Sequence, residues 1–383
     1  MDTAQLHRLQ ERRQHAKSLL QQGLLQEALD AYKKLCHDHK TDPESHYMLG
    51  SVYAQLGKFD TAVLHFRDCI RLQPQAFIAH CGMGAVLREM GRFNEAEQAF
   101  RTALNLQPKN PDATLELAIC LLKQHNLEEP EALFQRVLVS RPDSAEALHG
   151  LGEIRHATRR YEEAIDFYQR TLKIAPDRTG TYNRIGHALF RLGRCDEAIH
   201  YFNEAIRIRP NFAEAYNNLG SALMNSGQPE KARQAFSQAL TIKPDYIDAQ
   251  VSEIHLLEHE GNLEDACEML DLLLQRNIEH PGLATTFLNL CTQLDRCEEA
   301  VEYADWVVKH SRLAANMELM IQFALGRLYD KQGNYHKAFQ HYQRGNELTT
   351  DNFNEAEHIA IIDALTRVFS WQFFATTQRA TVR

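Results

Sequence analysis

The chain has 383 residues, with 51 acidic and 42 basic side chains and a formal net charge of −9. This acidic balance argues against a nucleic-acid partner, because proteins that bind nucleic acid usually carry a basic surface. No stretch approaches the roughly 18 apolar residues that a membrane-spanning helix needs, which excludes a transmembrane protein. The N-terminus has no apolar signal segment and the eight cysteines contain no CxxC pair, so we expect a cytoplasmic protein with free thiols.

Glycine and proline recur along the chain with a period of 34 residues. Seven glycines follow this period, with one offset of four residues before the last: Gly23, Gly57, Gly91, Gly193, Gly227, Gly261 and Gly333. Six prolines share it: Pro74, Pro108, Pro142, Pro176, Pro210 and Pro244. A fixed period of this length predicts a tandem array, in which each unit buries its apolar face only against its neighbours.

The unit is clearest from Thr179 to Pro210. Apolar residues follow helical spacing up to Leu189, and Gly193 then supplies a stop that can adopt a left-handed backbone. A second helical run, 196–208, ends before Pro210. Each unit is therefore predicted to be a helix, a tight turn, a second helix and a short loop.

Three positions predict how the two helices of this unit pack. Gly186 and Ala198 lack bulk where the helices cross, and Phe202 fills a wider gap. Small residues at unit positions 8, 20 and 27, an aromatic residue at 24 and proline at 32 resemble the tetratricopeptide repeat (TPR) family. The resemblance implies an all-α, right-handed superhelical solenoid of about ten helix-turn-helix units in residues 1–352. The units begin near Leu9, Pro43, Phe77, Pro111, Ala145, Thr179, Ala213, Ile247, Pro281 and Leu319.

The ninth unit departs most from the pattern. Leu288 stands at the first glycine position and Asp295 at the glycine of the turn. A four-residue insertion around 311–318 then precedes the tenth unit. We expect the repeat to persist through both changes.

The segment after the repeats is predicted to form one more amphipathic helix, at 353–374, that caps the solenoid and is followed by a flexible tail at 375–383. Its aromatic cluster, Trp371, Phe373 and Phe374, is too large for one helix stripe and suggests contact with another chain, so a homo-oligomer is one hypothesis. The segment has the pattern His358-x-x-x-Ile362-Asp363-Ala364-Leu365-x-x-x-Phe369-x-x-x-Phe373-Phe374. This pattern resembles the junction between repeats and catalytic domain in bacterial TPR sulfotransferases.

The TPR resemblance also implies a concave groove lined by the first helix of each unit, through unit positions 2, 5, 6, 9, 12 and 13. These positions are strongly polar in units five to eight. Asparagine can pair with an extended peptide backbone and arginine with a carboxylate, so we predict a peptide-binding site there. The candidate residues are His149, Glu153, Asn183, Arg184, His187, Arg191, Asn217, Asn218, Asn225 and His255.

Three histidines on or beside these positions invite a comparison with metal sites. His149, Glu153 and His156 lie at i, i+4 and i+7 of one helix, with His187 on the next unit. Their spacing lacks the HExxH form, so we predict no metal site and no cofactor. The chain also lacks a glycine-rich phosphate loop, which argues against intrinsic catalysis.

The predicted function is a non-catalytic scaffold or adaptor for a protein or peptide partner. The alternative is the substrate-recruiting N-terminal region of a TPR sulfotransferase-like enzyme whose catalytic domain is missing from this chain.

Overall fold

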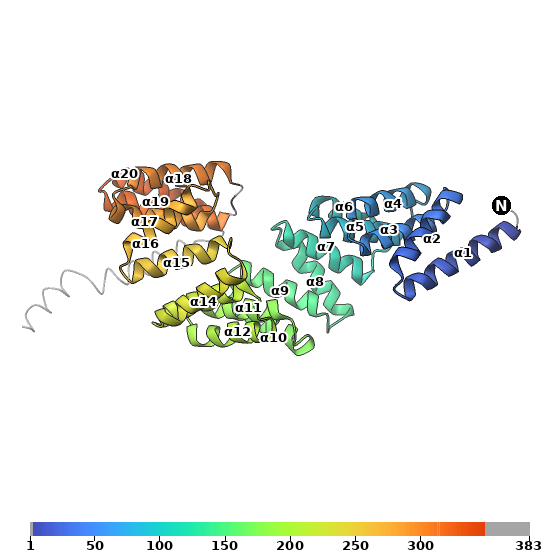
Figure 1. The fold of residues 1–383 in the computed structure, drawn as a ribbon, viewed down its shortest axis with the longest axis horizontal. Coiled ribbons are helices and arrows are strands. Elements are labelled where there is room, and N and C mark those ends of the chain that lie inside the picture. Colours follow the sequence, from blue (N-terminus) through green and yellow to red (C-terminus); the bar gives the residue numbers. More distant parts are fainter. Residues whose placement is uncertain (1–2, 312, 314, 349–383) are drawn as a thin grey trace, which may run out of the picture. The chain divides into compact units, whose positions relative to one another are not determined.

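The computed structural model describes residues 3–311, 313 and 315–348, and in this part of the chain every regular element is an α-helix (Figure 1). The helices form two compact units, Met1–Ile242 and Lys243–Arg383. The predicted all-α solenoid of helix-turn-helix repeats is therefore confirmed. No helix in the described ranges is both long and apolar enough to cross a membrane.

The first unit contains seven helical hairpins in chain order. They are α1 (Thr3–Gln21) with α2 (Leu25–Asp38), α3 (Pro43–Gln55) with α4 (Phe59–Leu72), α5 (Phe77–Glu89) with α6 (Phe93–Leu106), α7 (Pro111–Lys123) with α8 (Glu128–Ser140), α9 (Ala145–Ala157) with α10 (Tyr161–Ile174), α11 (Thr179–Arg191) with α12 (Cys195–Ile208), and α13 (Ala213–Asn225) with α14 (Pro229–Ile242). Within this unit, each second helix from α2 to α12 also packs against the first helix of the next hairpin.

The second unit contains three described hairpins. They are α15 (Ile247–His259) with α16 (Leu263–Leu274), α17 (Pro281–Leu294) with α18 (Cys297–His310), and α19 (Ala315–Lys331) with α20 (Tyr335–Glu347). One apolar core joins them, with Leu270, Phe287 and Leu325 fully buried at its centre.

The turn inside each hairpin requires a left-handed backbone. Gly193 has φ of +75°, and the same conformation recurs at the matching glycines. Where glycine is missing, other residues adopt it: His125 at φ 61°, Arg159 at 59° and Asp295 at 55°. The turn geometry therefore persists without glycine, at the steric cost of holding a Cβ in this region.

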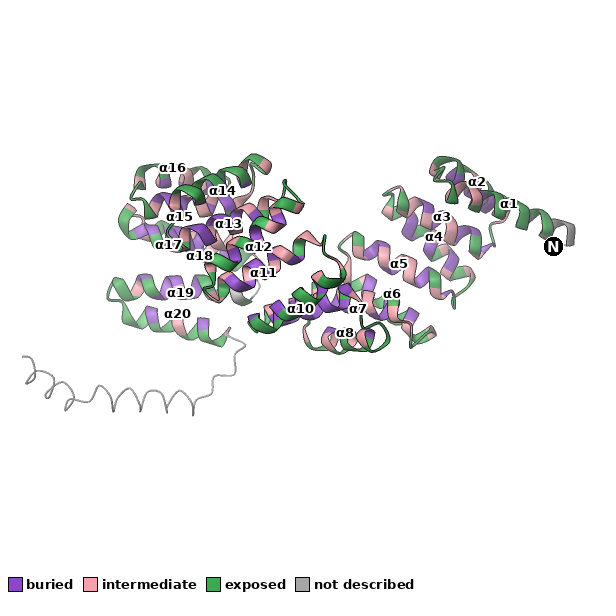
Figure 2. Cartoon of the chain, turned by 90° about the horizontal axis from the view of Figure 1, so that it is seen from below, coloured by how far each residue is buried: buried purple, intermediate pink, exposed green. Residues whose placement is uncertain are grey.

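The crossing of the two helices in a hairpin depends on a glycine packed against an aromatic ring. A Cβ added at Gly186 would lie 2.6 Å from the Phe202 ring, and one at Gly220 would lie 2.4 Å from Phe236. Phe202 is only 1% exposed. Buried residues accordingly follow the helix sides that face one another (Figure 2).

The insertion before the tenth repeat lengthens a helix. We expected this repeat to begin near Leu319, but α19 begins at Ala315 and has 17 residues, whereas α11 has 13. The added residues thus extend the first helix by about one turn at its N-terminal end.

Three predictions lie outside the described residues. They are the capping helix at 353–374, the tail at 375–383 and the aromatic cluster of Trp371, Phe373 and Phe374. The expected extent of the solenoid, to residue 352, and the segment after it stay predictions.

Candidate functional site

The polar residues expected to line a groove fall in both compact units. Nine of them lie on α9, α11 and α13 of the first unit, and His255 lies on α15 of the second. In the first unit, first helices of successive repeats contact one another, as α7 does with α9 and α11 with α13. The side chains on α9, α11 and α13 therefore form the candidate site, and His255 is described separately.

A charged network joins α9 to α11. Arg184 Nε lies 2.9 Å from Glu153 Oε1, and the Tyr168 hydroxyl donates to the same oxygen over 2.7 Å. Burial raises the pKa of Glu153, but the Arg184 guanidinium and its other partners outweigh burial and leave that pKa lowered. Burial lowers the pKa of His149, 3.8 Å from Glu153, to about 4. At neutral pH the network therefore holds a carboxylate, a guanidinium and a neutral imidazole.

A histidine pair continues this network along α9 and α11. His156 Nε2 and His187 Nδ1 are 2.8 Å apart, the distance of an ordinary hydrogen bond. Burial lowers the pKa of both rings to about 4, so the pair is neutral at physiological pH. Arg191 lies beside them, with its guanidinium carbon 5.4 Å from the centre of the Tyr161 ring.

The asparagines connect α11 to α13. Asn183 Nδ2 donates to Glu214 Oε1 over 2.8 Å, and Asn218 Nδ2 donates to Asn183 Oδ1 over 3.0 Å. Asn183 is only 2% exposed, so it does not face solvent but holds the Glu214 and Asn218 side chains in place. Asn217 is also buried, and its Oδ1 atom has no hydrogen-bond partner. Asn225, in contrast, is exposed at the end of α13.

His255 has a separate set of partners in the second unit. Its Nε2 atom lies 2.9 Å from Thr286 Oγ1 on α17, and its Nδ1 atom lies 3.6 Å from Glu258. The structure thus joins residues of α9, α11 and α13 into one network and gives His255 local partners of its own.

A different histidine pair, absent from the sequence-based candidates, lies on α3 and α4. His46, His65 and Asp68 place three potential ligand atoms within 4.8 Å of one another. A signal existed in the repeat, because His46 and His65 occupy unit positions 4 and 23. The same positions meet in the tenth repeat, where His341 Nδ1 is 2.8 Å from Gln322 Oε1.

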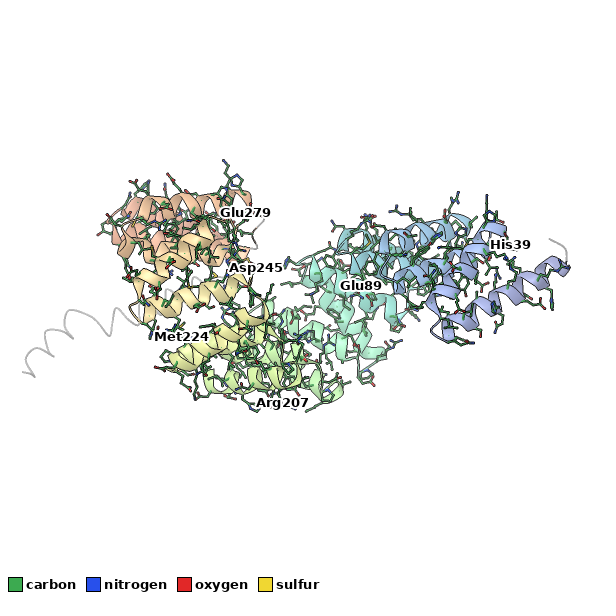
Figure 3. All side chains as sticks on the ribbon, in the orientation of Figure 1. His39, Glu89, Arg207, Met224, Asp245 and Glu279 are labelled. Atoms are coloured by element: carbon green, nitrogen blue, oxygen red, sulfur yellow. The ribbon has the colours of Figure 1, made fainter. Side chains whose placement is uncertain are left out.

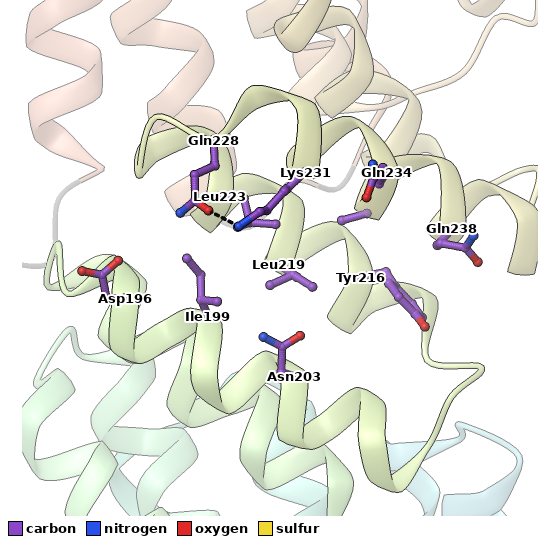
Figure 4. A pocket seen from close by; sticks show the side chains of 11 residues that line it. Asp196, Ile199, Asn203, Tyr216, Leu219, Leu223, Gln228, Lys231, Gln234 and Gln238 are labelled. Atoms are coloured by element: carbon purple, nitrogen blue, oxygen red, sulfur yellow. Dashed lines mark hydrogen bonds between the residues drawn. The ribbon is translucent and has the colours of Figure 1, made fainter.

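A pocket of about 450 Å³ lies between α12 and α14, with part of α13 as its floor (Figure 4). Its floor is apolar, with Leu219 and Leu223, and its rim is polar, with Lys231 donating to Gln228 over 2.8 Å. The other lining residues are Asp196, Ile199, Asn203, Tyr216, Gln234, Ala235 and Gln238. The repeat pattern does not indicate this pocket, because its rim consists of ordinary polar residues on the outer faces of helices.

Comparison with known proteins identifies the repeats. Family models described as tetratricopeptide repeats match residues 13–77 and 183–247, 87–151, 143–211 and 323–352. No curated protein sequence matches the chain significantly.

Solved structures show the same fold. A crystal structure of a tetratricopeptide repeat protein from Parabacteroides merdae is 16% identical and has a TM-score of 0.53, with 65% of this chain and 97% of that chain covered. The crystal structure of PilW, a widely conserved type IV pilus biogenesis factor, is also 16% identical and has a TM-score of 0.51, with coverage of 54% and 96%. Identities this low establish a common fold alone. With its repeated hairpins and family matches over more than half of its residues, the chain belongs to the tetratricopeptide repeat family.

Proposed function

We propose that the chain is a non-catalytic scaffold that binds an extended peptide, or a disordered segment of a partner, against α9, α11 and α13. The observation that carries this proposal is the hydrogen-bonded network across these helices, from Glu153 and Arg184 to Asn183 and Asn218. Side chains that are already held in place lose less conformational entropy when a ligand binds. A polar surface of this kind favours binding over mere solvation of a helix face.

The position of the first helices supports a groove at this place. First helices of successive repeats contact one another along much of the first unit, in the pairs α3–α5, α5–α7, α7–α9 and α11–α13. In a curved stack, the row whose members touch lies on the inner side, so the groove-facing side chains converge.

The chemistry of the site favours a segment that carries a carboxylate. Arg184 is 41% exposed, and its Nε atom forms the ion pair with Glu153. Arg191 is also exposed and lies beside the Tyr161 ring. Guanidinium groups bind carboxylates in a forked geometry. We propose that these two arginines hold an acidic side chain and that Asn218 pairs with the peptide backbone.

The test begins with peptides selected from a random display library against the full chain. Binding of a labelled selected peptide is then measured by fluorescence anisotropy for the wild type and for the double variant Arg184→Ala/Arg191→Ala. Loss of a charge-assisted hydrogen bond predicts a weakening of about 1.5–3 kcal/mol, or roughly 10- to 150-fold, and the double variant should lose at least this much.

Arg207→Ala is the matched control, because Arg207 is an exposed arginine on α12, the second helix of its hairpin, and the proposed groove is formed by first helices (Figure 3). Unchanged binding in the control and weaker binding in the double variant support the groove. Equal binding by all three proteins, or loss only in the control, refutes it.

The remaining parts of the proposal rest on the sequence. We propose a cytoplasmic location with free thiols and no nucleic-acid partner. We also propose self-association through Trp371, Phe373 and Phe374. Substitution of Trp371 and Phe374 by alanine tests the last one, since sedimentation would show a dimer shifting to a monomer. The alternative function, a recruiting region of a sulfotransferase-like enzyme, rests on residues 358–374, and no feature of the described residues favours it.

A further inference from the structure

We propose that His46, His65 and Asp68 form a binding site for a divalent transition metal of the zinc type within the second repeat. His46 lies on α3, and His65 and Asp68 lie on α4, so the ion would join the two helices of one hairpin. Two imidazoles and one carboxylate are a ligand set that suits zinc and its first-row neighbours.

The orientation of His46 prepares one ring nitrogen to bind a metal. Its Nε2 atom lies 3.3 Å from the carbonyl oxygen of Lys40, and since a carbonyl can only accept, Nε2 carries the proton. The Nδ1 atom is then the unprotonated nitrogen, and it faces His65 and Asp68. A carbonyl that accepts from the other ring nitrogen is the usual support of a histidine that binds a metal.

The separation of the two rings fits shared ligation better than a hydrogen bond. His46 Nδ1 and His65 Nδ1 are 3.4 Å apart, longer than the about 2.9–3.0 Å that is most common for a hydrogen bond. Tetrahedral coordination with Zn–N bonds of about 2.05 Å places two ligand nitrogens about 3.3–3.4 Å apart. The pair His156–His187, at 2.8 Å, has the hydrogen-bonded distance instead.

Asp68 supplies the third ligand and forms the solvent-exposed side of the site. Its Oδ2 atom lies 3.8 Å from His46 Nδ1, and its Oδ1 atom accepts a hydrogen bond from Arg71 over 3.0 Å. Asp68 is 39% exposed, so a small side-chain rotation brings Oδ2 to the ion, whereas the side chain of His46 is only 10% exposed. Three protein ligands leave a fourth position for water.

The third repeat contains a built-in control. His80 occupies the position of His46 and makes the same bond, from Nε2 to the Pro74 carbonyl over 3.0 Å. The residues that match His65 and Asp68 in this repeat are Ala99 and Thr102, which cannot complete the site. His80 therefore has the same local support as His46 but not the ligand set.

The test uses the full chain, stripped with a chelator and titrated with Zn²⁺ in competition with a chromophoric chelator. We expect one tight ion per chain in the wild type and in His80→Ala. Substitutions that change one outer partner of a metal site already cost about 10- to 100-fold in affinity, so His65→Ala should weaken binding by at least that range. Asp68→Ala is the second variant, because it alters an exposed side chain and tests the site if His65→Ala unfolds.

Two further measurements make the result decisive. Zn²⁺ should raise the melting temperature of the wild type and of His80→Ala but not of Asp68→Ala, because an ion that binds only the folded chain stabilises it. Ca²⁺ should have no such effect, since a hard cation needs six to eight oxygen ligands. Unchanged zinc affinity in folded Asp68→Ala and His65→Ala, or an equal response to Ca²⁺, would overturn the proposal.

Discussion

The substitution Gly186→Ala tests whether the glycine–aromatic contact sets the helix crossing. The added Cβ would lie 2.6 Å from Phe202 Cε1 and 2.8 Å from Cδ1, whereas carbon atoms in contact normally stay about 3.5–4.0 Å apart. Phe202 is buried, so the ring cannot swing into solvent and the helices must separate. Overpacking of this kind costs about 1–3 kcal/mol, and the better helix propensity of alanine offsets about 1 kcal/mol of it. We expect a net loss of about 1 kcal/mol.

Gly180→Ala is the matched control in the same helix. Nothing lies within 4 Å of a Cβ built at Gly180, so only the propensity gain of up to about 1 kcal/mol remains. The same chemical change in α11 is thus expected to destabilise at one position and stabilise at the other. Urea unfolding followed by circular dichroism at 222 nm would measure both changes.

A second substitution makes the cause of the loss specific. Phe202→Leu removes part of the ring that the new methyl group would meet, so the cost of Gly186→Ala should shrink in that background. A coupling energy of about 0.5–2 kcal/mol in the double-mutant cycle is expected for residues in contact. If Gly186→Ala is as stable as the wild type, or if the two substitutions add independently, the packing argument is wrong.

Three further predictions concern turns, pH and the groove. His125→Gly should stabilise the chain by about 1 kcal/mol in urea unfolding, because His125 is exposed and holds φ of 61° in the left-handed region. Stability should fall as pH drops from about 6.5 to 4, by up to about 1.4 kcal/mol per pH unit for each of three partly buried histidines, since only the unfolded chain takes up protons there. The groups concerned are His149, His156 and His187. Replacing the last two by glutamine should flatten this slope, and an unchanged slope would contradict the assignment. Asn183→Ala should cost about 1–3 kcal/mol of stability, measured by the same unfolding assay, because it removes the two hydrogen bonds that this buried side chain makes to Glu214 and Asn218.

Much of the fold can be predicted from the sequence because the residues that each hairpin needs recur at the same positions in successive units. Gly193 and its equivalents mark the left-handed turn, and a single exception such as His125 does not hide the period. The contact between Gly186 and Phe202 was likewise predictable, since small and large residues alternate at fixed unit positions. A residue type that recurs at the same position in most units can therefore be recognised even though some units differ.

The arrangement within the candidate site was less predictable. Groove position 5 predicts an outward-facing residue, yet Asn183 is almost fully buried and bonds to Glu214 and Asn218. Its burial depends on side chains from the next repeat, which a pattern within one unit does not describe. His46 and His65 were missed for a related reason, because their approach depends on two positions that rarely both carry histidine.

The division between constant and variable positions explains where function can arise in this solenoid. Where a repeat has glycine at position 8 and an aromatic residue at 24, their contact maintains the helix crossing, so a substitution there costs stability. Positions 4, 5, 9 and 23 do not make this glycine–aromatic contact, and their residue types vary from one repeat to the next. The second repeat uses 4 and 23 for His46 and His65, whereas the sixth uses 5 and 9 for Asn183 and His187. Separate sites can thus occur in separate repeats without disturbing the shared core.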